Sequence, residues 1–238
     1  MSFPLIVAHR GYSALAPENT LVALRMALDA GAPACEVDVH LTADDQLVVM
    51  HDHTVDRTTD GSGAIRDMAV DELRSLDAGA WKDPKYAGEP VPLLTEVLDL
   101  MRDRAHLILE IKDDRIEEHV AHVLAGECAV PRVTIVSFSY DTCRRMRQIL
   151  PGLAVLWLIG GGERGADELA TLALEGGLQG LSVHHKIVTE GFFDVLLRRG
   201  LSLWAWTVND DEEARRLAAL GIPSITSDDP VALARALA

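Results

Sequence analysis

The sequence predicts an α/β fold, specifically a TIM barrel in which eight βα units close into a (β/α)8 cylinder. Short apolar runs alternate with helical patterns along almost the whole chain, which is typical of βαβ units and a parallel sheet. The runs amount to about eight units, and 238 residues match the usual size of such a barrel. No glycine-rich dinucleotide loop follows the first run, which disfavours an open, doubly wound sheet.

Local signals place the elements of this barrel along the chain. Asn19 or Thr20 stands near the N-cap of the first helix, and Gly31 follows its last turn. The apolar runs 35–41 and 47–50 form a hairpin-like pair that counts as one unit. Strands are expected at residues 5–8, 35–41, 47–50, 107–111, 133–138, 154–159, 178–183, 203–207 and 224–226. Helices are expected at residues 18–30, 71–76, 115–125, 141–150, 167–175, 189–199, 210–220 and 229–237.

One segment, about residues 52–92, interrupts this alternation. It contains the Asp-Gly-Ser-Gly run at residues 60–63 and several further prolines and glycines, with one short helical piece. Its length of about 40 residues lies near the lower limit for independent folding. We therefore expect a small insertion after the second βα region, packed over one end of the barrel, within a single domain that spans residues 1–238.

The overall charge restricts the partners of the protein. The chain carries 37 acidic and 22 basic residues, for a net charge of -15. Such a surface repels nucleic acids and anionic membranes, so neither is an expected partner. An anionic small-molecule substrate would need a local positive centre, supplied by a metal ion or by buried Arg and Lys side chains.

The cysteines and the N-terminal residues indicate a compartment. The chain has three widely spaced cysteines, Cys35, Cys128 and Cys143. This odd number and spacing fit neither a disulfide framework nor a zinc site. Cys35 lies in an apolar run and is expected in the core. Residues 1–4 lack a basic region, and the apolar run that follows is too short for a signal peptide or a membrane span. We expect a cytoplasmic protein without stable membrane insertion, and the oligomeric state stays open.

Three carboxylates are expected inside the barrel, near the C-terminal ends of its strands. Glu36 and Asp38 are two positions apart on one strand, so their side chains share a face, and Glu110 and Lys112 have the same relation. Active sites of TIM barrels lie at this end. Carboxylates inside a barrel are costly without a cation, and three of them suit a divalent metal, Mg²⁺ or Ca²⁺. Buried ion pairs with Arg10 and Lys112 are the alternative that needs no metal.

Further polar side chains follow the same strand ends. His9 and His51 each end an apolar run and supply two groups that exchange protons near neutral pH. Arg10 and Lys112 supply the positive charge that a phosphate needs. Trp206 is expected to form an apolar wall at the end of its strand, and Trp204 is expected to face the helices. Together these groups predict a phosphoryl-transfer site.

An ordered set of motifs resembles the glycerophosphodiester phosphodiesterase family, in its small, bacterial type. The motifs are His9-Arg10-Gly11, Pro17-Glu18-Asn19-Thr20, Glu36-Val37-Asp38, His51-Asp52, Glu110-Ile111-Lys112, Trp206 and the closing Asp228-Asp229-Pro230. They run from residue 9 to residue 230 in the family's order, with an insertion after the His-Asp pair. Ser227 stands where relatives often have threonine, which retains the hydroxyl.

The resemblance implies a metal-dependent TIM barrel enzyme that hydrolyses glycerophosphodiesters to glycerol 3-phosphate and an alcohol. It implies three metal ligands, two acid-base histidines and two phosphate-binding cations. The metal ligands would be Glu36, Asp38 and Glu110. The acid-base histidines would be His9 and His51, and the phosphate-binding cations would be Arg10 and Lys112. In the mechanism that follows, the metal lowers the pKa of a glycerol hydroxyl, which attacks phosphorus while one histidine takes its proton. The other histidine protonates the departing alcohol, and water then opens the cyclic phosphate.

Other functions stay open at this point. A lysophospholipase D or a phosphatidylinositol phospholipase-like enzyme would use Trp81 and Tyr86 of the insertion to contact acyl chains. A barrel that binds glycerophosphodiesters without turnover is the alternative that is not an enzyme. Which histidine is acid and which is base, and whether His184 or His185 reaches the site, also stay open. Asn19 is expected to cap the first helix rather than to support the site.

Overall fold

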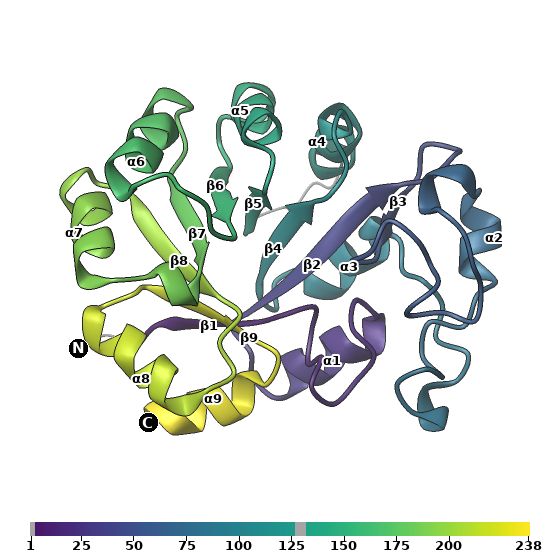
Figure 1. The fold of residues 1–238 in the computed structure, drawn as a ribbon. Helices are drawn as coiled ribbons and strands as arrows, with labels where there is room; N and C mark the ends of the chain where they lie inside the picture. The colour runs from purple at the N-terminus through teal and green to yellow at the C-terminus, as the bar shows by residue number, and fades with distance from the viewer. Residues whose placement is uncertain (1–2, 127–131) are drawn as a thin grey trace.

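The structure, a computed structural model, describes residues 3–126 and 132–238. Within these residues, the strands form one sheet of nine, in which all neighbouring strands are parallel except β2 and β3. The sheet closes because β1 pairs with both β9 and β2, so that Ala8 lies beside Ser227 on one side and Cys35 on the other. Figure 1 shows helices around the outside of the strands. The predicted TIM barrel is confirmed.

The barrel strands and the helices that cover them alternate along the chain. The strands are β1 (Leu5–Ala8), β2 (Ala34–Leu41), β4 (His106–Ile111), β5 (Val133–Ser137), β6 (Ala154–Ile159), β7 (Gly180–His184), β8 (Ser202–Trp206) and β9 (Ser224–Ser227). The covering helices are α1 (Leu21–Asp29), α3 (Leu94–Met101), α4 (Glu117–Gly126), α5 (Tyr140–Ile149), α6 (Ala166–Glu175), α7 (Glu190–Arg198), α8 (Asp211–Leu220) and α9 (Pro230–Leu237). Among the described residues, no helix is long and apolar enough to cross a membrane.

Helix α3, which follows directly after the irregular segment, was not among the predicted helices. Its buried side chains, Leu94, Val97, Leu98 and Met101, have the i, i+3, i+4, i+7 spacing of an amphipathic helix. The N-terminus of the helix also has a capping interaction, because the Glu96 carboxylate accepts a hydrogen bond from the Leu93 N–H. The prolines upstream indicated a loop, although the apolar spacing of residues 94–101 is that of a helix.

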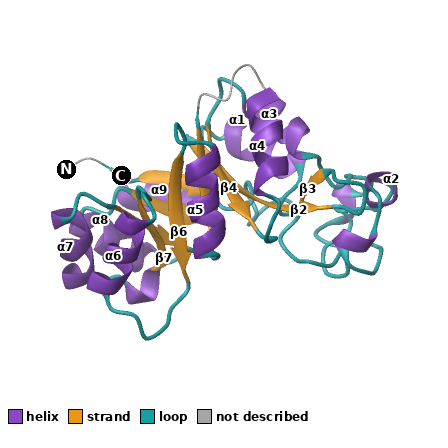
Figure 2. Cartoon of the chain, turned by 90° about the horizontal axis from the view of Figure 1, so that it is seen from above, coloured by secondary structure: helices purple, strands orange, loops and turns teal. Residues whose placement is uncertain are grey.

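Residues 52–92 lie to one side of the barrel, at the far right in Figure 1, and are mostly loop in Figure 2. The segment follows β3 (Leu47–Val49), which pairs antiparallel with the end of β2. It contains helix α2 (Val70–Arg74) and two short 3₁₀ helices, Ile65–Asp67 and Pro84–Tyr86. A small apolar cluster of its own, with Val55, Ile65, Leu73 and Val91 among its members, packs against Val48 and Met50.

Alternate side chains of each strand face opposite sides, and this sets where the site can form. Leu107, Leu109, Cys35 and Val37 belong to the large core between strands and helices. The interior of the barrel holds a second apolar cluster, which includes Val7, Ala34, Ile108, Val136, Leu156 and Leu158. Even-numbered positions of β2 and β4 therefore point inward, and Glu36, Asp38 and Glu110 are among them.

Both described cysteines are buried free thiols, Cys35 and Cys143. Burial raises the pKa of each to about 12, so they are unreactive core residues. The prediction for Cys35 is confirmed, and Cys128 lies outside the described residues.

Candidate active site

The three predicted carboxylates meet inside the barrel. Glu36 and Asp38 come from β2 and Glu110 comes from β4, where it pairs directly with Asp38 across the two strands. One carboxylate oxygen from each residue lies within 4.8 Å of one from each of the others. Glu36 and Asp38 are buried, and Glu110 is partly buried. Oxygen ligands converging from adjacent strands suit a hard divalent cation.

The electrostatics of this cluster fit such a cation. Burial raises the pKa of Glu36 well above its usual value, and the charges of Asp38 and Glu110 raise it further. Burial and the charge of Asp38 raise the pKa of Glu110 to about 7. Among the described residues, Oδ1 of Asp38 is buried without a hydrogen-bond partner. A divalent cation would relieve the repulsion and satisfy this oxygen.

Two basic side chains border the carboxylates without neutralising all of them. Lys112 Nζ lies 2.9 Å from Glu110 and 3.5 Å from Oδ1 of Asp38. Arg10 Nε lies 3.3 Å from Oδ2 of Asp38 without making a hydrogen bond, so this contact is electrostatic. Although burial acts to raise the pKa of Asp38, the charges of Arg10 and Lys112 hold it below its usual value.

Glu36 decides between a metal site and simple ion pairing. Its carboxylate accepts a hydrogen bond from the backbone N–H of Arg10, at 3.0 Å, and its other close contact is His9 Nε2 at 4.0 Å. Among the described residues, no Lys or Arg side chain forms an ion pair with it. Ion pairs with Arg10 and Lys112 thus account for Asp38 and Glu110 but not for Glu36, which favours a metal ion.

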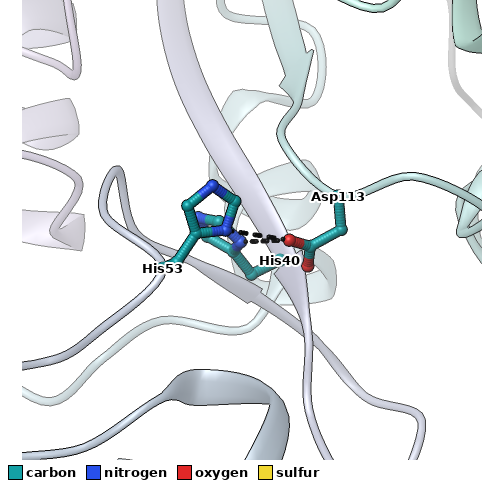
Figure 3. Close-up of side chains that lie close together, drawn as sticks. All are labelled: His40, His53 and Asp113. Atoms are coloured by element: carbon teal, nitrogen blue, oxygen red, sulfur yellow. Dashed lines mark hydrogen bonds and ion pairs between the residues drawn. The ribbon is translucent and has the colours of Figure 1, made fainter.

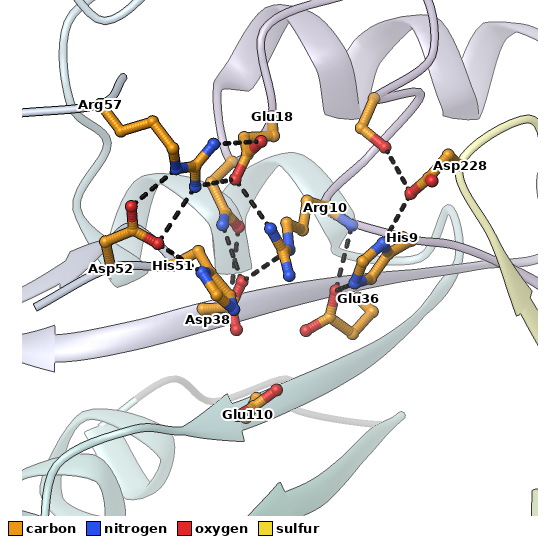
Figure 4. Close-up of polar contacts among 12 residues, drawn as sticks. His9, Arg10, Glu18, Glu36, Asp38, His51, Asp52, Arg57, Glu110 and Asp228 are labelled. Carbon is orange, nitrogen blue, oxygen red and sulfur yellow. Dashed lines mark hydrogen bonds and ion pairs between the residues drawn. The ribbon is translucent and has the colours of Figure 1, made fainter. Parts of the chain in front are cut away.

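Each predicted acid-base histidine binds a carboxylate through Nδ1 (Figure 4). His9 Nδ1 lies 2.6 Å from Oδ1 of Asp228, and His51 Nδ1 lies 2.6 Å from Oδ1 of Asp52. A carboxylate only accepts hydrogen bonds, so Nδ1 carries a proton in both rings and Nε2 stays available for proton transfer. Burial acts to raise the pKa of Asp228, but the hydrogen bond and charge of His9 help to lower it to about 2.

A hydrogen-bonded chain that the sequence analysis did not predict links His51 to Arg10. Arg57 donates to both oxygens of Glu18, at 2.8 and 3.0 Å, and to both oxygens of Asp52, at 2.6 and 3.1 Å. Glu18 in turn accepts from Arg10 at 2.8 Å, and Asp52 binds His51. The signal was the arginine six positions after His51, but a sequence alone does not show which carboxylates it meets.

The role expected for Asn19 is wrong. Thr20 caps α1 by accepting from the Ala23 N–H. Asn19, which has a positive φ of 58°, instead donates from Nδ2 to Oδ2 of Asp38 at 2.8 Å. It therefore holds the central carboxylate of the site.

The loop between β1 and α1 depends on Gly11. Its φ is +79°, and a Cβ there would lie 2.6 Å from the carbonyl carbon of Ala23. The absence of a side chain lets the loop lie against α1, where the Tyr12 N–H donates to the Ala23 carbonyl at 3.0 Å. Gly11 thereby fixes the position of the preceding His9 and Arg10.

The cavity at the carboxylates has one polar and one apolar side. His9, Arg10, Glu36, His51 and Glu110 form the polar side. The apolar side includes Phe138, Leu158, Trp204 and Trp206. The expectation that Trp204 faces the helices is wrong, because residues two apart on a strand share a face. Both indoles line the cavity.

Neighbouring side chains hold Trp206. Its indole N–H donates to the Ser182 carbonyl at 3.0 Å, and Phe138 packs edge to face against it at 5.6 Å between ring centroids. His184 contacts it in the same way at 5.2 Å, whereas His185 binds Glu213 at 2.8 Å. His184 therefore reaches the wall of the site, and His185 is engaged elsewhere.

Comparison with known proteins identifies the family. Residues 9–232 match the model of the glycerophosphoryl diester phosphodiesterase family. The chain belongs to this family. A glycerophosphodiester phosphodiesterase of Caldanaerobacter subterraneus subsp. tengcongensis is 36% identical over 238 residues, which cover 96% of each chain.

Solved structures of the glycerophosphodiester phosphodiesterase family have the same fold. An Oleispira antarctica phosphodiesterase in complex with the product sn-glycerol-3-phosphate is 29% identical, with a TM-score of 0.92 over 99% of this chain and 97% of that one. The Agrobacterium tumefaciens glycerophosphodiester phosphodiesterase is 28% identical, with a TM-score of 0.86 over 98% and 100% of the two chains. Family membership and the acidic cluster together support a divalent metal.

Proposed function

We propose that this chain hydrolyses glycerophosphodiesters to glycerol 3-phosphate and an alcohol. The observation that carries this proposal is a cluster of three carboxylates beside a cavity that two histidines line, each histidine oriented by a carboxylate of its own. Family membership supports the same reaction class. The test is an assay for glycerol 3-phosphate with glycerophosphocholine as substrate, using the wild type and the His9→Ala and His51→Ala variants.

In this proposal, Glu36, Asp38 and Glu110 hold a divalent ion, Mg²⁺ or Ca²⁺. When bound, such an ion supplies Lewis-acid stabilisation of the phosphoryl oxygens and lowers the pKa of a coordinated hydroxyl. Asn19 and Lys112 hold Asp38 and Glu110 in place.

His9 and His51 move the protons of the reaction. One histidine takes the proton of a glycerol hydroxyl as its oxygen forms a bond to phosphorus. The other gives a proton to the alcohol oxygen as the bond between that oxygen and phosphorus breaks. The product of this step is a cyclic phosphate, which water opens with the two proton transfers reversed. Asp228 and Asp52 keep a proton on Nδ1 of each ring, so that Nε2 is the atom that takes or gives the transferred proton.

Arg10 and Lys112 bind the phosphate in this proposal, and Trp206 provides an apolar wall for the glycerol carbons. Arg10 is fixed by Glu18, which leaves its planar head group oriented for an anion. The alternative is an enzyme that acts on lipids. Comparing the rates of hydrolysis of glycerophosphocholine and lysophosphatidylcholine distinguishes the two. Trp81, which such a lipid would contact, donates its indole N–H to the Ala78 carbonyl of the insertion.

We also propose that residues 1–238 act as one domain, with the segment 52–92 as its insertion, and that the protein works in the cytoplasm. The buried free thiols of Cys35 and Cys143 accord with a reducing compartment. The cyclic product would then be opened, and glycerol 3-phosphate released, within the cell.

A further inference from the structure

A second group of metal-binding side chains lies outside the catalytic cavity. His40 stands near the end of β2, Asp113 follows β4, and His53 belongs to the insertion. Nδ1 of His40 lies 2.9 Å from Oδ1 of Asp113, and Nδ1 of His53 lies 3.2 Å from the same oxygen. Figure 3 shows both imidazole rings turned towards that carboxylate. Neither histidine has a part in the proposed reaction.

The remaining polar atoms of His40 and Asp113 are already bound. Nε2 of His40 lies 3.2 Å from the backbone carbonyl oxygen of His51, and a carbonyl only accepts, so Nε2 carries the proton. Oδ2 of Asp113 accepts from the Leu41 N–H at 2.9 Å. One ligand atom from each of His40, His53 and Asp113 lies within 4.8 Å of one from each of the others. The three side chains therefore converge as the ligands of a single cation do.

The geometry suits a transition metal. Metal-binding histidines usually donate their second ring N–H to a backbone carbonyl or a carboxylate, as His40 does here. Around a tetrahedral Zn²⁺ with ligand distances near 2.0–2.2 Å, neighbouring ligand atoms lie about 3.3 Å apart. The separations of 2.9 and 3.2 Å need little adjustment to meet this value. Imidazole nitrogens favour Zn²⁺ and similar ions over Mg²⁺ or Ca²⁺.

We propose that His40, His53 and Asp113 form a second metal site, which takes Zn²⁺ or a chemically similar transition metal. The His40 side chain is 1% exposed and the His53 side chain 70% exposed, so the site is anchored inside and open to solvent outside. Water completes the coordination on the open side. The site is joined to the catalytic cavity because His40 holds the backbone of His51. Its ligand set differs from the oxygen-only set of Glu36, Asp38 and Glu110.

The test is a calorimetric titration of Zn²⁺ into the full chain in saturating Mg²⁺. The wild type is expected to bind one equivalent of Zn²⁺. In His53→Ala and His53→Gln the affinity should fall by about 100-fold or more, since losing a ligand costs at least as much as losing a second-shell partner. The exposed His122 of α4 provides the control, and His122→Ala should bind Zn²⁺ as the wild type does.

Two results would overturn the proposal. The first is that the wild type binds no Zn²⁺ under these conditions, which would make His40 and Asp113 a simple ion pair. The second is that both His53 variants bind Zn²⁺ with wild-type affinity and stoichiometry, which would place the metal elsewhere. Because His53 is mostly exposed, both variants should fold, and circular dichroism checks this directly. Co²⁺ offers a second readout, since its absorption spectrum should lose intensity in the His53 variants.

Discussion

His9 Nδ1 and Oδ1 of Asp228 lie 2.6 Å apart, although 219 residues separate them in the chain. The contact is made at the seam of the barrel, where β1 pairs with β9. Asp228 also accepts from Ser13 at 3.1 Å and from Asn209 at 2.6 Å. Closure of the barrel therefore sets the orientation of one proposed acid-base histidine.

Replacing Asp228 tests this orientation. In Asp228→Asn, the new amide no longer fixes the proton of His9 on Nδ1, so kcat should fall by about 10²-fold, within the range attributed to one acid-base group. KM should change little, because Asp228 does not face the phosphate in our proposal. The exposed Asp211 of α8 is a matched control, and Asp211→Asn should keep wild-type turnover. Unchanged kcat in Asp228→Asn would remove the role given to this pair.

Replacing Trp206 tests the apolar wall. Trp206→Ala should raise KM for glycerophosphocholine by about tenfold, because the indole no longer covers the glycerol carbons and burial is worth about 0.8 kcal/mol per CH2 group. Trp81→Ala, in the insertion, should leave KM unchanged with the same substrate. A rise in KM for the Trp81 variant alone, and only with lysophosphatidylcholine, would instead favour the lipid alternative.

Replacing Gly11 tests the loop that carries His9 and Arg10. Gly31 has a similar φ, +84°, but a Cβ there would meet nothing within 4 Å. Gly31→Ala should therefore cost only the backbone strain, about 1–2 kcal/mol of unfolding free energy. Gly11→Ala should cost more, because its Cβ would also overlap α1. Urea unfolding of the two variants measures the difference, and equal losses would show that the close approach to α1 is unimportant.

The pH dependence of stability tests the carboxylate cluster in metal-free protein. Glu110 has a pKa of about 7 in the folded chain, against an ordinary value of 4.5. Between pH 4.5 and pH 7 the carboxyl is protonated in the folded state and ionised in the unfolded state. Its contribution to the free energy of unfolding is therefore complete below pH 4.5 and is lost as the pH rises through 7. Burial lowers the pKa of His51, which acts in the opposite direction over part of this range.

A comparison with Glu110→Gln separates these effects. The wild-type Tm after chelation should fall, relative to that of Glu110→Gln, as pH rises from 4.5 to 7.5. Excess Mg²⁺ should reduce the fall, since metal binding requires ionised carboxylates. If the difference in Tm between wild type and variant is flat across this range, burial and the charge of Asp38 do not raise the pKa of Glu110 in the folded chain.

The barrel and the inward side chains could be predicted because both follow from local periodicity. Alternation along β2 and β4 was enough to place Glu36, Asp38 and Glu110 on one face. The same alternation places Trp204 on the face of Trp206, so the expectation that Trp204 faces the helices was wrong. Helix α3 was not predicted although its apolar spacing is regular, because it follows directly after an irregular segment that contains Pro84, Pro90 and Pro92.

The rest of the site depends on contacts that no local pattern contains. Arg57 joins Glu18 to Asp52 only because the insertion folds back towards the loop after β1. Asn19 turns towards Asp38 because its backbone adopts a positive φ, and from the sequence it was indistinguishable from a helix cap. The contacts of His40 with Asp113 and His53 likewise join three separate segments of the chain.

Removing and returning the metal tests whether the reaction requires an ion at Glu36, Asp38 and Glu110. Glycerol 3-phosphate release from glycerophosphocholine is followed before exhaustive chelation, after it, and after Mg²⁺ or Ca²⁺ is returned. Chelation should abolish turnover, one of these ions should restore it, and Glu36→Gln should not recover under the same conditions. Full activity in thoroughly chelated wild-type protein would show that the reaction needs no metal at these carboxylates.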